Sequence, residues 1–413
     1  MSTSVDRAAL ARNEHMTFRA NMGVGRHGWL RLTPAYGVRL VRDRISPLPE
    51  GSVITDPFSG TGTTPLAAAE LGHYGQSVDV NPFLIWLGRV KTAHYSSATL
   101  IAAVEAAQEV VASAQAHHRD DNLWQPNLFK IEKWWSPGAL HALKALRASI
   151  DRYEGQVKDL LEISLCRSLI SVSNAAFDHQ SMSFKDGSGE PALFEMDDAT
   201  QAFSTFSSEM SSIIESARYD LLGSASIHEG DSRVGVQGLK EADLVLTSPP
   251  YVNRMSYIRE LRPYMYWLRY LDLASDAGDL DWRAIGGTWG TATSKLKTWS
   301  PMTETPVDDA IRTVCARIAE DGGKNGPLLA SYVHKYHHDM WLHFQSITPV
   351  VKQGGSVSYI VGNSTFYGHE VPAHEWYADM LKELGYCDVK IVTIRKRNSN
   401  KALFEYDVTG GRP

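Results

Sequence analysis

The chain has 413 residues, 43% of them hydrophobic, and a formal net charge of −6 at pH 7. This length and composition allow a substantial hydrophobic core, which excludes a disordered tail or a linker. The negative net charge excludes binding of polyanions by bulk attraction alone, so any contact with nucleic acid must come from local basic clusters. Such clusters occur at residues 26–44, 254–269 and 390–401.

The three cysteines, Cys166, Cys315 and Cys387, are far apart and lie in no CxxC or Cys/His pattern. Their spacing argues against a metal site and a disulfide framework, and it fits a reducing compartment. The first residues lack the apolar stretch of a signal peptide, and no later stretch approaches the roughly 18 apolar residues that span a membrane. We therefore expect a soluble cytoplasmic protein with neither a metal nor a membrane partner.

Several short apolar runs end in Gly, Asp or Pro, as buried parallel strands do. These runs predict strands over residues 52–55, 76–80, 226–228, 243–247, 356–362 and 389–394. Between them, Ala-rich or three-and-four-spaced apolar patterns predict helices over residues 64–71, 100–116 and 372–384. Strands that alternate with helices indicate an α/β domain with a largely parallel sheet.

The first predicted strand runs into a glycine turn, DPFSGTGTT at residues 56–64, and then into a helix. Gly60 and Gly62 let the backbone pass close to a ligand, and the helix start offers free N–H groups. Asp79 ends the next strand, 17 positions after Gly62. This is near the roughly 20 residues that separate a glycine turn from the ribose-binding acid of nucleotide-binding βαβ units. Because the third glycine of GxGxxG is missing, the pattern indicates a nucleoside without a pyrophosphate.

The turn at 56–64 resembles the DPFxGxGTT cofactor motif of S-adenosylmethionine-dependent DNA amino-methyltransferases. The resemblance implies a Rossmann-like methyltransferase fold with a mainly parallel seven-stranded sheet, and S-adenosyl-L-methionine as cofactor. It places Asp56 near the methionine part of the cofactor, Asp79 on the ribose and Asp231 near the adenine amino group. For Asp231, capping of a helix after a strand is the alternative. The other residues expected at the cofactor are Phe58, Gly60, Gly62, Thr63, Thr64, Asn81 and Thr247.

A long, mostly helical stretch at 96–222 interrupts the alternation of strands and helices, and it includes a polar loop at 174–191. Loops of such length within a compact domain are usually functional or disordered. We expect the segment 178–185 of this loop to contact the target base through His179, although a lone histidine is more often structural.

The predicted strand at 243–247 ends in Ser248-Pro249-Pro250-Tyr251. Two prolines fix the backbone and aim their carbonyl groups rigidly. An exocyclic base amine is a poor nucleophile because its lone pair is delocalised into the ring. Acceptors on both of its N–H groups favour the tetrahedral nitrogen of the transition state. Ser248 Oγ and the Pro249 carbonyl are suitable acceptors, Tyr251 can stack on the base, and in-line attack then needs mainly positioning.

This tetrapeptide resembles the (S/T/D)PP(Y/F) catalytic motif of the same family, in which Ser commonly goes with cytosine and Asp with adenine. The resemblance implies methylation of the N4 amine of a cytosine that is flipped out of duplex DNA, in a restriction-modification or defence system with a cognate restriction endonuclease. The next residues, Asn253, Arg254 and Tyr257, are expected to face the flipped nucleotide, with helix capping as the alternative for Asn253.

Three further segments resemble the family. Residues 27–36 resemble the segment that precedes the cofactor strand and closes over methionine. Residues 354–364 resemble a later strand beside the base pocket, with Asn363 as a substrate contact, and 395–400 resemble a terminal hairpin that carries Arg397. In the family, the segment that recognises the target is expected in one of a few places relative to the motifs. The place between Asp231 and Asp243 is too short here, because only about a dozen residues separate them. Recognition must then come from 96–222, from 273–332, or from both. The second of these stretches is rich in Gly, Thr, Ser and Trp, and we expect it to be irregular.

The chain thus divides into five segments: the cofactor-binding half of the catalytic domain at 24–95, a helical insertion at 96–222, the half with the SPPY sequence at 223–272, an irregular insertion at 273–332, and the C-terminal strands at 333–413. Four alternatives remain open. They are an adenine-N6 DNA methyltransferase, an RNA base amino-methyltransferase, a nucleic-acid-binding protein with an inactive methyltransferase fold, and a small-molecule or protein amino-methyltransferase. RNA enzymes normally carry an N-terminal RNA-binding module, and only about fifty residues precede the first strand.

Overall fold

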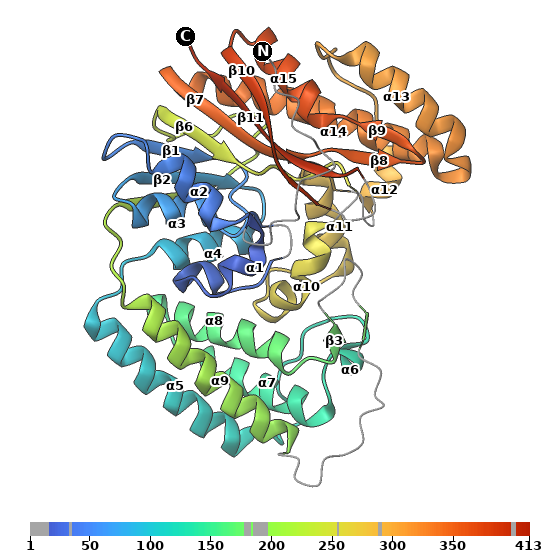
Figure 1. Ribbon diagram of the computed structural model, residues 1–413. Helices are drawn as coiled ribbons and strands as arrows, with labels where there is room; N and C mark the ends of the chain where they lie inside the picture. The colour runs from blue at the N-terminus through green and yellow to red at the C-terminus, as the bar shows by residue number, and fades with distance from the viewer. Residues whose placement is uncertain are drawn as a thin grey trace.

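The computed structural model describes residues 16–32, 35–176, 183–184, 197–253, 256–287, 291–397 and 402–413. Its centre is a seven-stranded sheet with the strand order β10-β11-β7-β6-β1-β2-β5 (Figure 1). The strands are β1 (Val53–Asp56), β2 (Tyr74–Asp79), β5 (Ser224–Glu229), β6 (Ala242–Thr247), β7 (Val351–Gly362), β10 (Cys387–Lys396) and β11 (Phe404–Gly411). From β7 to β5 every pair is parallel, whereas β11 runs antiparallel to both β7 and β10. The predicted α/β fold with a mainly parallel seven-stranded sheet is confirmed.

The two faces of the sheet are covered by different helices. On one face, Ile54 of β1 and Leu246 of β6 pack against α2 (Val38–Ile45) and α3 (Thr63–Glu70). On the other face, Val245 of β6 packs with residues of α14 (Gly326–Ile347) and α15 (Ala373–Glu383). Successive side chains of a strand point to opposite faces, so the apolar run of β6 supplies both cores. Helix α4 (Pro82–Thr92) follows β2.

The strand of the seven-stranded sheet that sequence patterns missed is β11, which lies between β10 and β7. Its sequence, FEYDVTGG, alternates polar with apolar residues and ends in two glycines, so it does not look like an interior strand. Glu405 and Asp407 are nevertheless buried, because Arg395 of β10 pairs with Glu405 and Arg44 of α2 pairs with Asp407. Buried charges are tolerated when they are paired in this way.

The described residues between 96 and 222 form a helical bundle that lies beyond α4 and α10 (Tyr257–Trp267), away from the sheet (Figure 1). The bundle consists of α5 (Ser97–His117), α6 (Ile131–Trp134), α7 (Pro137–Ile150), α8 (Gly155–Ser171) and α9 (Asp198–Ala217), with the short pair β3 (Ala175–Ala176) and β4 (Ser183–Phe184). Its apolar core is continuous with that of α4 and α10, since residues such as Leu146, Phe206, Phe83 and Trp267 belong to one cluster. The bundle is therefore packed onto the sheet domain.

The expectation of an irregular segment at 273–332 was wrong. The segment contains α11 (Ala274–Arg283), α12 (Thr291–Leu296), α13 (Asp308–Asp321), the 3-10 turn η4 (Gly323–Asn325) and the start of α14. Its many small polar residues have low helix propensity, but packing against neighbouring elements overrides propensity. In α13, Ile311, Cys315 and Ile318 form a buried stripe at helical spacing in the same core as α14.

The remaining elements are short. They are α1 (Phe18–Asn21), η3 (Gly25–Gly28), η5 (Thr348–Val350), β8 (Ser364–Phe366) and β9 (His369–Val371). No helix within the described ranges is both long and apolar enough to cross a membrane. Those same ranges hold no group of three or more His, Cys, Asp or Glu side chains arranged to bind a metal ion.

Candidate active site

The glycine turn and the SPPY sequence leave the sheet side by side. Strands β1 and β6 are parallel neighbours, with Ile54 opposite Leu244 and Thr55 opposite Val245. The chain passes from β1 to β2 on one side, whereas β6 lies on the other, so the two strand ends form a topological switch point, where α/β proteins commonly bind ligands. A cavity of about 380 Å³ opens there, within the range of roughly 300–1,000 Å³ usual for small-molecule sites.

Hydrogen bonds hold the glycine turn against the end of β2. Gly60 and Gly62 have φ values of +51° and +72°, which other residues rarely adopt. The backbone N–H of Gly60 donates to Asp79 Oδ2 at 3.0 Å, and the N–H of Asn81 donates to Asp79 Oδ1 at 2.9 Å. A Cβ on Gly62 would lie 3.2 Å from the Cα of Gly88, so this glycine also permits close packing of α3 on α4. Asp79 thus joins the turn to the second strand while it lines the cavity.

Asp56 is not on the cavity wall, although the resemblance placed it near the cofactor. Only 1% of the residue is exposed. Its Oδ1 accepts hydrogen bonds from the Thr247 hydroxyl at 2.6 Å and from the Phe58 N–H at 3.0 Å. Burial raises the pKa of Asp56 to about 6, and these hydrogen bonds oppose the shift. The pKa of Asp79 is likewise raised by burial to about 6.

The segment before β1 also reaches the cavity, through Leu32, Ala35 and Tyr36. The Tyr36 hydroxyl is hydrogen-bonded to Thr64 Oγ1, so the hydroxyl of Thr64 already has a hydrogen-bond partner within the protein. Tyr36 is a residue that our site prediction missed. The signal was present, since it lies in the 27–36 segment that resembles the family.

The SPPY residues also line the cavity. The Tyr336 hydroxyl donates a hydrogen bond to the Pro250 carbonyl at 2.6 Å, so this carbonyl oxygen already has a partner within the protein. The Tyr251 N–H donates to the Tyr257 hydroxyl at 3.0 Å and fixes the direction in which the chain leaves the corner. Ser248 and Pro249 line the cavity, and each residue has an oxygen that can accept a hydrogen bond.

Glu405, Arg395 and Arg397 complete the wall beside Tyr251. The Arg397 guanidinium lies over the Tyr251 ring, with Cζ 5.1 Å from the ring centroid. Its Nε donates to the Phe404 carbonyl at 3.0 Å and its Nη2 to the Asn363 carbonyl. We did not predict Arg395 or Glu405 as site residues. Arg395 was recognisable as part of a basic cluster, whereas Glu405 carried no signal in the sequence.

Asn363 does not line the cavity. Its side-chain amide donates to Glu370 Oε1 at 2.7 Å and to the Ala402 carbonyl at 3.0 Å, and its Oδ1 accepts from the Phe404 N–H at 2.8 Å. Asn363 therefore holds together the backbone that positions Arg397, instead of facing a substrate.

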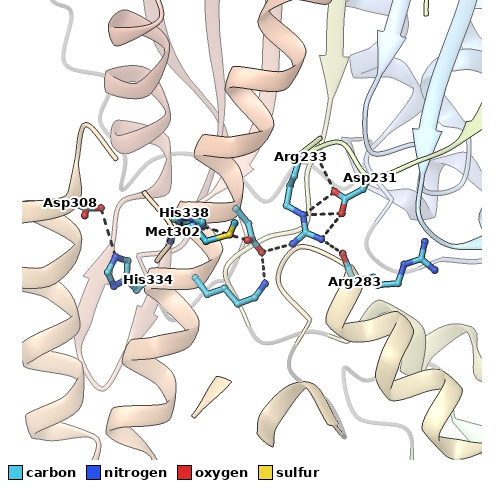
Figure 2. A network of polar contacts seen from close by, with 9 residues as sticks. Asp231, Arg233, Arg283, Met302, Asp308, His334 and His338 are labelled. Atoms are coloured by element: carbon cyan, nitrogen blue, oxygen red, sulfur yellow. Dashed lines mark hydrogen bonds and ion pairs between the residues drawn. The ribbon is translucent and has the colours of Figure 1, made fainter. Parts of the chain in front are cut away.

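Asp231 reaches the cavity just beyond β5, where it is paired with Arg233 (Figure 2). It caps a turn and not a helix, because its Oδ1 accepts the Arg233 N–H at 3.0 Å. The Arg233 guanidinium also donates to Asp339 of α14 at 3.1 Å and to the Arg283 carbonyl at 2.8 Å. Arg283, Ala284 and Ile285, at the end of α11, line the cavity. Arg233 thus connects the edge of β5 with the 273–332 segment.

The structure brings most of the predicted site residues to one cavity. Those that line it are Phe58, Gly60, Thr63, Asp79, Asn81, Asp231, Ser248, Pro249, Pro250, Tyr251, Asn253, Tyr257 and Arg397. Those that lie behind or beside it are Asp56, Gly62, Thr64, Thr247 and Asn363. The predictions for His179 and Arg254 fall outside the described residues.

The chain has similarities to known proteins, although no family model matches it. It is 21% identical over 443 residues to the type II methyltransferase M.BsoBI of Geobacillus stearothermophilus, an alignment that covers 94% of this chain and 84% of the relative. It is 22% identical over 269 residues to the type II methyltransferase M.AvaI of a Nostoc species and of Anabaena variabilis, which covers 59% of this chain and 54% of each relative. The chain is a distant homologue of type II methyltransferases.

Proposed function

We propose that this protein transfers a methyl group from S-adenosyl-L-methionine to the exocyclic N4 amine of a cytosine flipped out of duplex DNA. It would act as the modification enzyme of a restriction-modification system, beside a cognate restriction endonuclease. The observation that carries the proposal is the single cavity bordered by the glycine turn and by Ser248-Pro249. The distant homology to a type II methyltransferase, which covers 94% of the chain, supports it.

The residues on the glycine-turn side fit the proposed cofactor. The Asp79 carboxylate can accept hydrogen bonds from ribose hydroxyls, and Asn81 lies beside it. Phe58 and Leu84 provide apolar wall for the uncharged parts of the molecule. When bound, the cofactor supplies an electrophilic methyl group on a sulfonium centre.

The opposite side fits a planar amine. Ser248 Oγ and the Pro249 carbonyl would accept the two N–H groups and favour the tetrahedral nitrogen that attacks. Since Arg397 covers one face of the Tyr251 ring, we propose that the target base stacks on the other. The chemical step needs no further group, because the nitrogen and the methyl carbon only have to be held in line. The methylated nitrogen then releases its extra proton to water.

Cytosine is proposed because a serine occupies the first position of the SPPY sequence. The position of the 273–332 segment supports a role in reading the target, since the end of α11 borders the cavity beside Asp231. The helical bundle of 96–222 is the second candidate for recognition. Asn253, Tyr257 and Arg397 are proposed to contact the flipped nucleotide, as they line the cavity on the SPPY side.

One assay tests the proposal. The purified protein is incubated with S-adenosylmethionine labelled in the methyl group and with separate pools of DNA and RNA, and the modified nucleoside is identified by mass spectrometry. We expect N4-methylcytosine in DNA. N6-methyladenine or label in RNA would refute the proposed target, and cofactor binding without transfer to any nucleic acid would support the inactive-fold alternative.

A further inference from the structure

The Ser248 hydroxyl ends a row of four hydrogen-bonded side chains. Arg395 donates to Glu405 through Nε at 2.7 Å and through Nη2 at 3.1 Å. The Tyr251 hydroxyl donates to Glu405 Oε1 at 2.8 Å. The Ser248 hydroxyl donates in turn to the Tyr251 oxygen at 3.4 Å. The four residues come from β10, β11 and the corner after β6, and all of them line the cavity.

The direction of each hydrogen bond follows from the first partner. An ionised carboxylate can only accept, and an arginine can only donate. The Tyr251 hydroxyl has one proton, and it donates that proton in the hydrogen bond to Glu405. The Tyr251 oxygen can then only accept, so in the contact between the two hydroxyl groups the Ser248 proton points toward Tyr251. The lone pairs that remain on Ser248 Oγ are left for the substrate amine.

Glu405, the carboxylate that sets the direction of the row, is held firmly in place. Glu405 is 3% exposed and is placed by the antiparallel ladder, opposite Arg395 on one side and Gly362 on the other. Burial, and after it the charge of Glu405, raises the pKa of Tyr251 well above its usual value. Tyr251 therefore keeps its proton throughout the neutral range.

We propose that Glu405 is a positioning residue that fixes the direction of the Ser248 hydroxyl, so that Ser248 offers the substrate amine acceptors only. The proposal rests on the proposed amine methylation. If the Ser248 proton pointed into the cavity, it would face the amine hydrogens or bind the nitrogen lone pair that has to attack. Either arrangement opposes the reaction, because the enzyme must stabilise the nucleophile in its attacking form.

Two substitutions change the row in different ways. Tyr251→Phe keeps the ring but removes the hydroxyl, so the Ser248 proton loses its fixed partner. We expect single-turnover methyl transfer to fall about tenfold, the equivalent of one net hydrogen bond, while KM for DNA stays the same. Glu405→Gln keeps the shape but reverses the row. Both carboxylate oxygens of Glu405 accept from Arg395, and the contact of Oε2 with Nε is the shorter at 2.7 Å. We therefore expect the glutamine carbonyl to take the place of Oε2 and its NH2 to take the place of Oε1, which faces Tyr251. Tyr251 then donates to Ser248 and turns the Ser248 proton into the cavity, which predicts a loss of more than about tenfold.

The decisive measurement is the double variant Glu405→Gln with Tyr251→Phe, in single-turnover assays with saturating DNA and labelled cofactor. Without the tyrosine hydroxyl, the NH2 group of the introduced glutamine has no hydrogen-bonded connection through which it could turn the Ser248 hydroxyl. We expect the double variant to transfer methyl groups faster than Glu405→Gln alone, at about the rate of Tyr251→Phe. A loss of packing or of stability at Glu405 would not be rescued by removing a second contact.

Tyr359→Phe is the matched control, because it removes the hydroxyl of another buried tyrosine, hydrogen-bonded to His343 and outside the cavity. Its rate should equal that of the wild type. If the losses in the double variant multiply instead, the positioning role of Glu405 is refuted and the proposed function is untouched. A wild-type protein that methylates no nucleic acid would overturn both.

Discussion

The Thr247 hydroxyl donates a 2.6 Å hydrogen bond to the Asp56 carboxylate, and the contact is buried. It joins the last residue of β6, just before Ser248, to the last residue of β1, which is also the first residue of the glycine turn. The separation between the two halves of the candidate site is therefore set by adjacent strands of one sheet and by a short hydrogen bond between their ends. Rigid elements of this kind suit a transfer that depends on positioning.

Ser248→Ala should lower the turnover of methyl transfer on the order of a hundredfold or more, because it removes an acceptor that acts on the nitrogen in the transition state. The affinity for S-adenosylmethionine, measured by calorimetry, should stay within error of the wild type, since Ser248 lies on the SPPY side of the cavity. Unchanged turnover would contradict the assignment of the base pocket.

Asp79→Ala should weaken cofactor binding, because it removes the proposed ribose acceptor and frees the N–H groups of Gly60 and Asn81. Calorimetry would measure the affinity, and equal affinities would count against the ribose role. In the wild type, the affinity should also fall as the pH drops below about 6, where Asp79 takes up a proton. Asp79→Asn should lack this dependence.

The same pKa values predict how stability changes with pH. Asp56 and Asp79 have pKa values raised from 3.8 to about 6, so the folded state binds more protons than the unfolded state between these values. Their contribution to the free energy of unfolding is therefore largest below pH 3.8 and is lost as the pH rises through about 6. Urea unfolding of Asp56→Asn at several pH values should show a weaker decline than the wild type across this window.

Gly362→Ala should impair the use of DNA without loss of the fold. A Cβ at this position would lie 2.5 Å from the Arg397 Cζ, so the guanidinium has to leave its place over Tyr251. We expect KM for DNA to rise about tenfold, the equivalent of one cation–π or hydrogen-bond contact, with cofactor affinity unchanged. Gly411→Ala in β11 is the control, because its Cβ would meet the nearest atom at an ordinary 3.5 Å. Equal KM values for both variants would refute a substrate role of Arg397.

Arg233→Met should destabilise the protein by about 2 kcal/mol, because it removes the shared partner of two carboxylates, Asp231 and Asp339, of which Asp339 keeps its ion pair with Lys335. Arg312→Met is the comparison. Arg312 also meets two carboxylates, but its side chain is 57% exposed, so the loss should be less than about 1 kcal/mol. Denaturant unfolding curves would compare the two, and similar midpoints would show that the Arg233 network adds little.

Motifs that consist of consecutive residues could be predicted from the sequence. The strand, turn and helix around Gly60 follow one another within a dozen positions, and the run 243–251 carries its own strand and corner. The directions of the side chains within the same motifs could not be predicted from the sequence. Asp56 belongs to the family-like turn, yet it points back into the sheet, because Thr247 from a strand 191 positions later supplies its hydrogen bond.

The sequence by itself determined the alternation of strands and helices, the glycine turn, and the chemistry of the Ser-Pro-Pro-Tyr corner, since each depends on local backbone preferences and residue types. Only the tertiary structure decided that β11 is an interior strand, that Glu405 meets Tyr251 and that Arg233 joins Asp231 to Asp339. The reason is physical: a charged side chain can be buried only beside a partner, and several of the partners here are far apart in the chain. Arg44 lies 363 positions from Asp407, Tyr251 lies 154 positions from Glu405, and Asp339 lies 106 positions from Arg233, beyond any pattern of neighbouring residues.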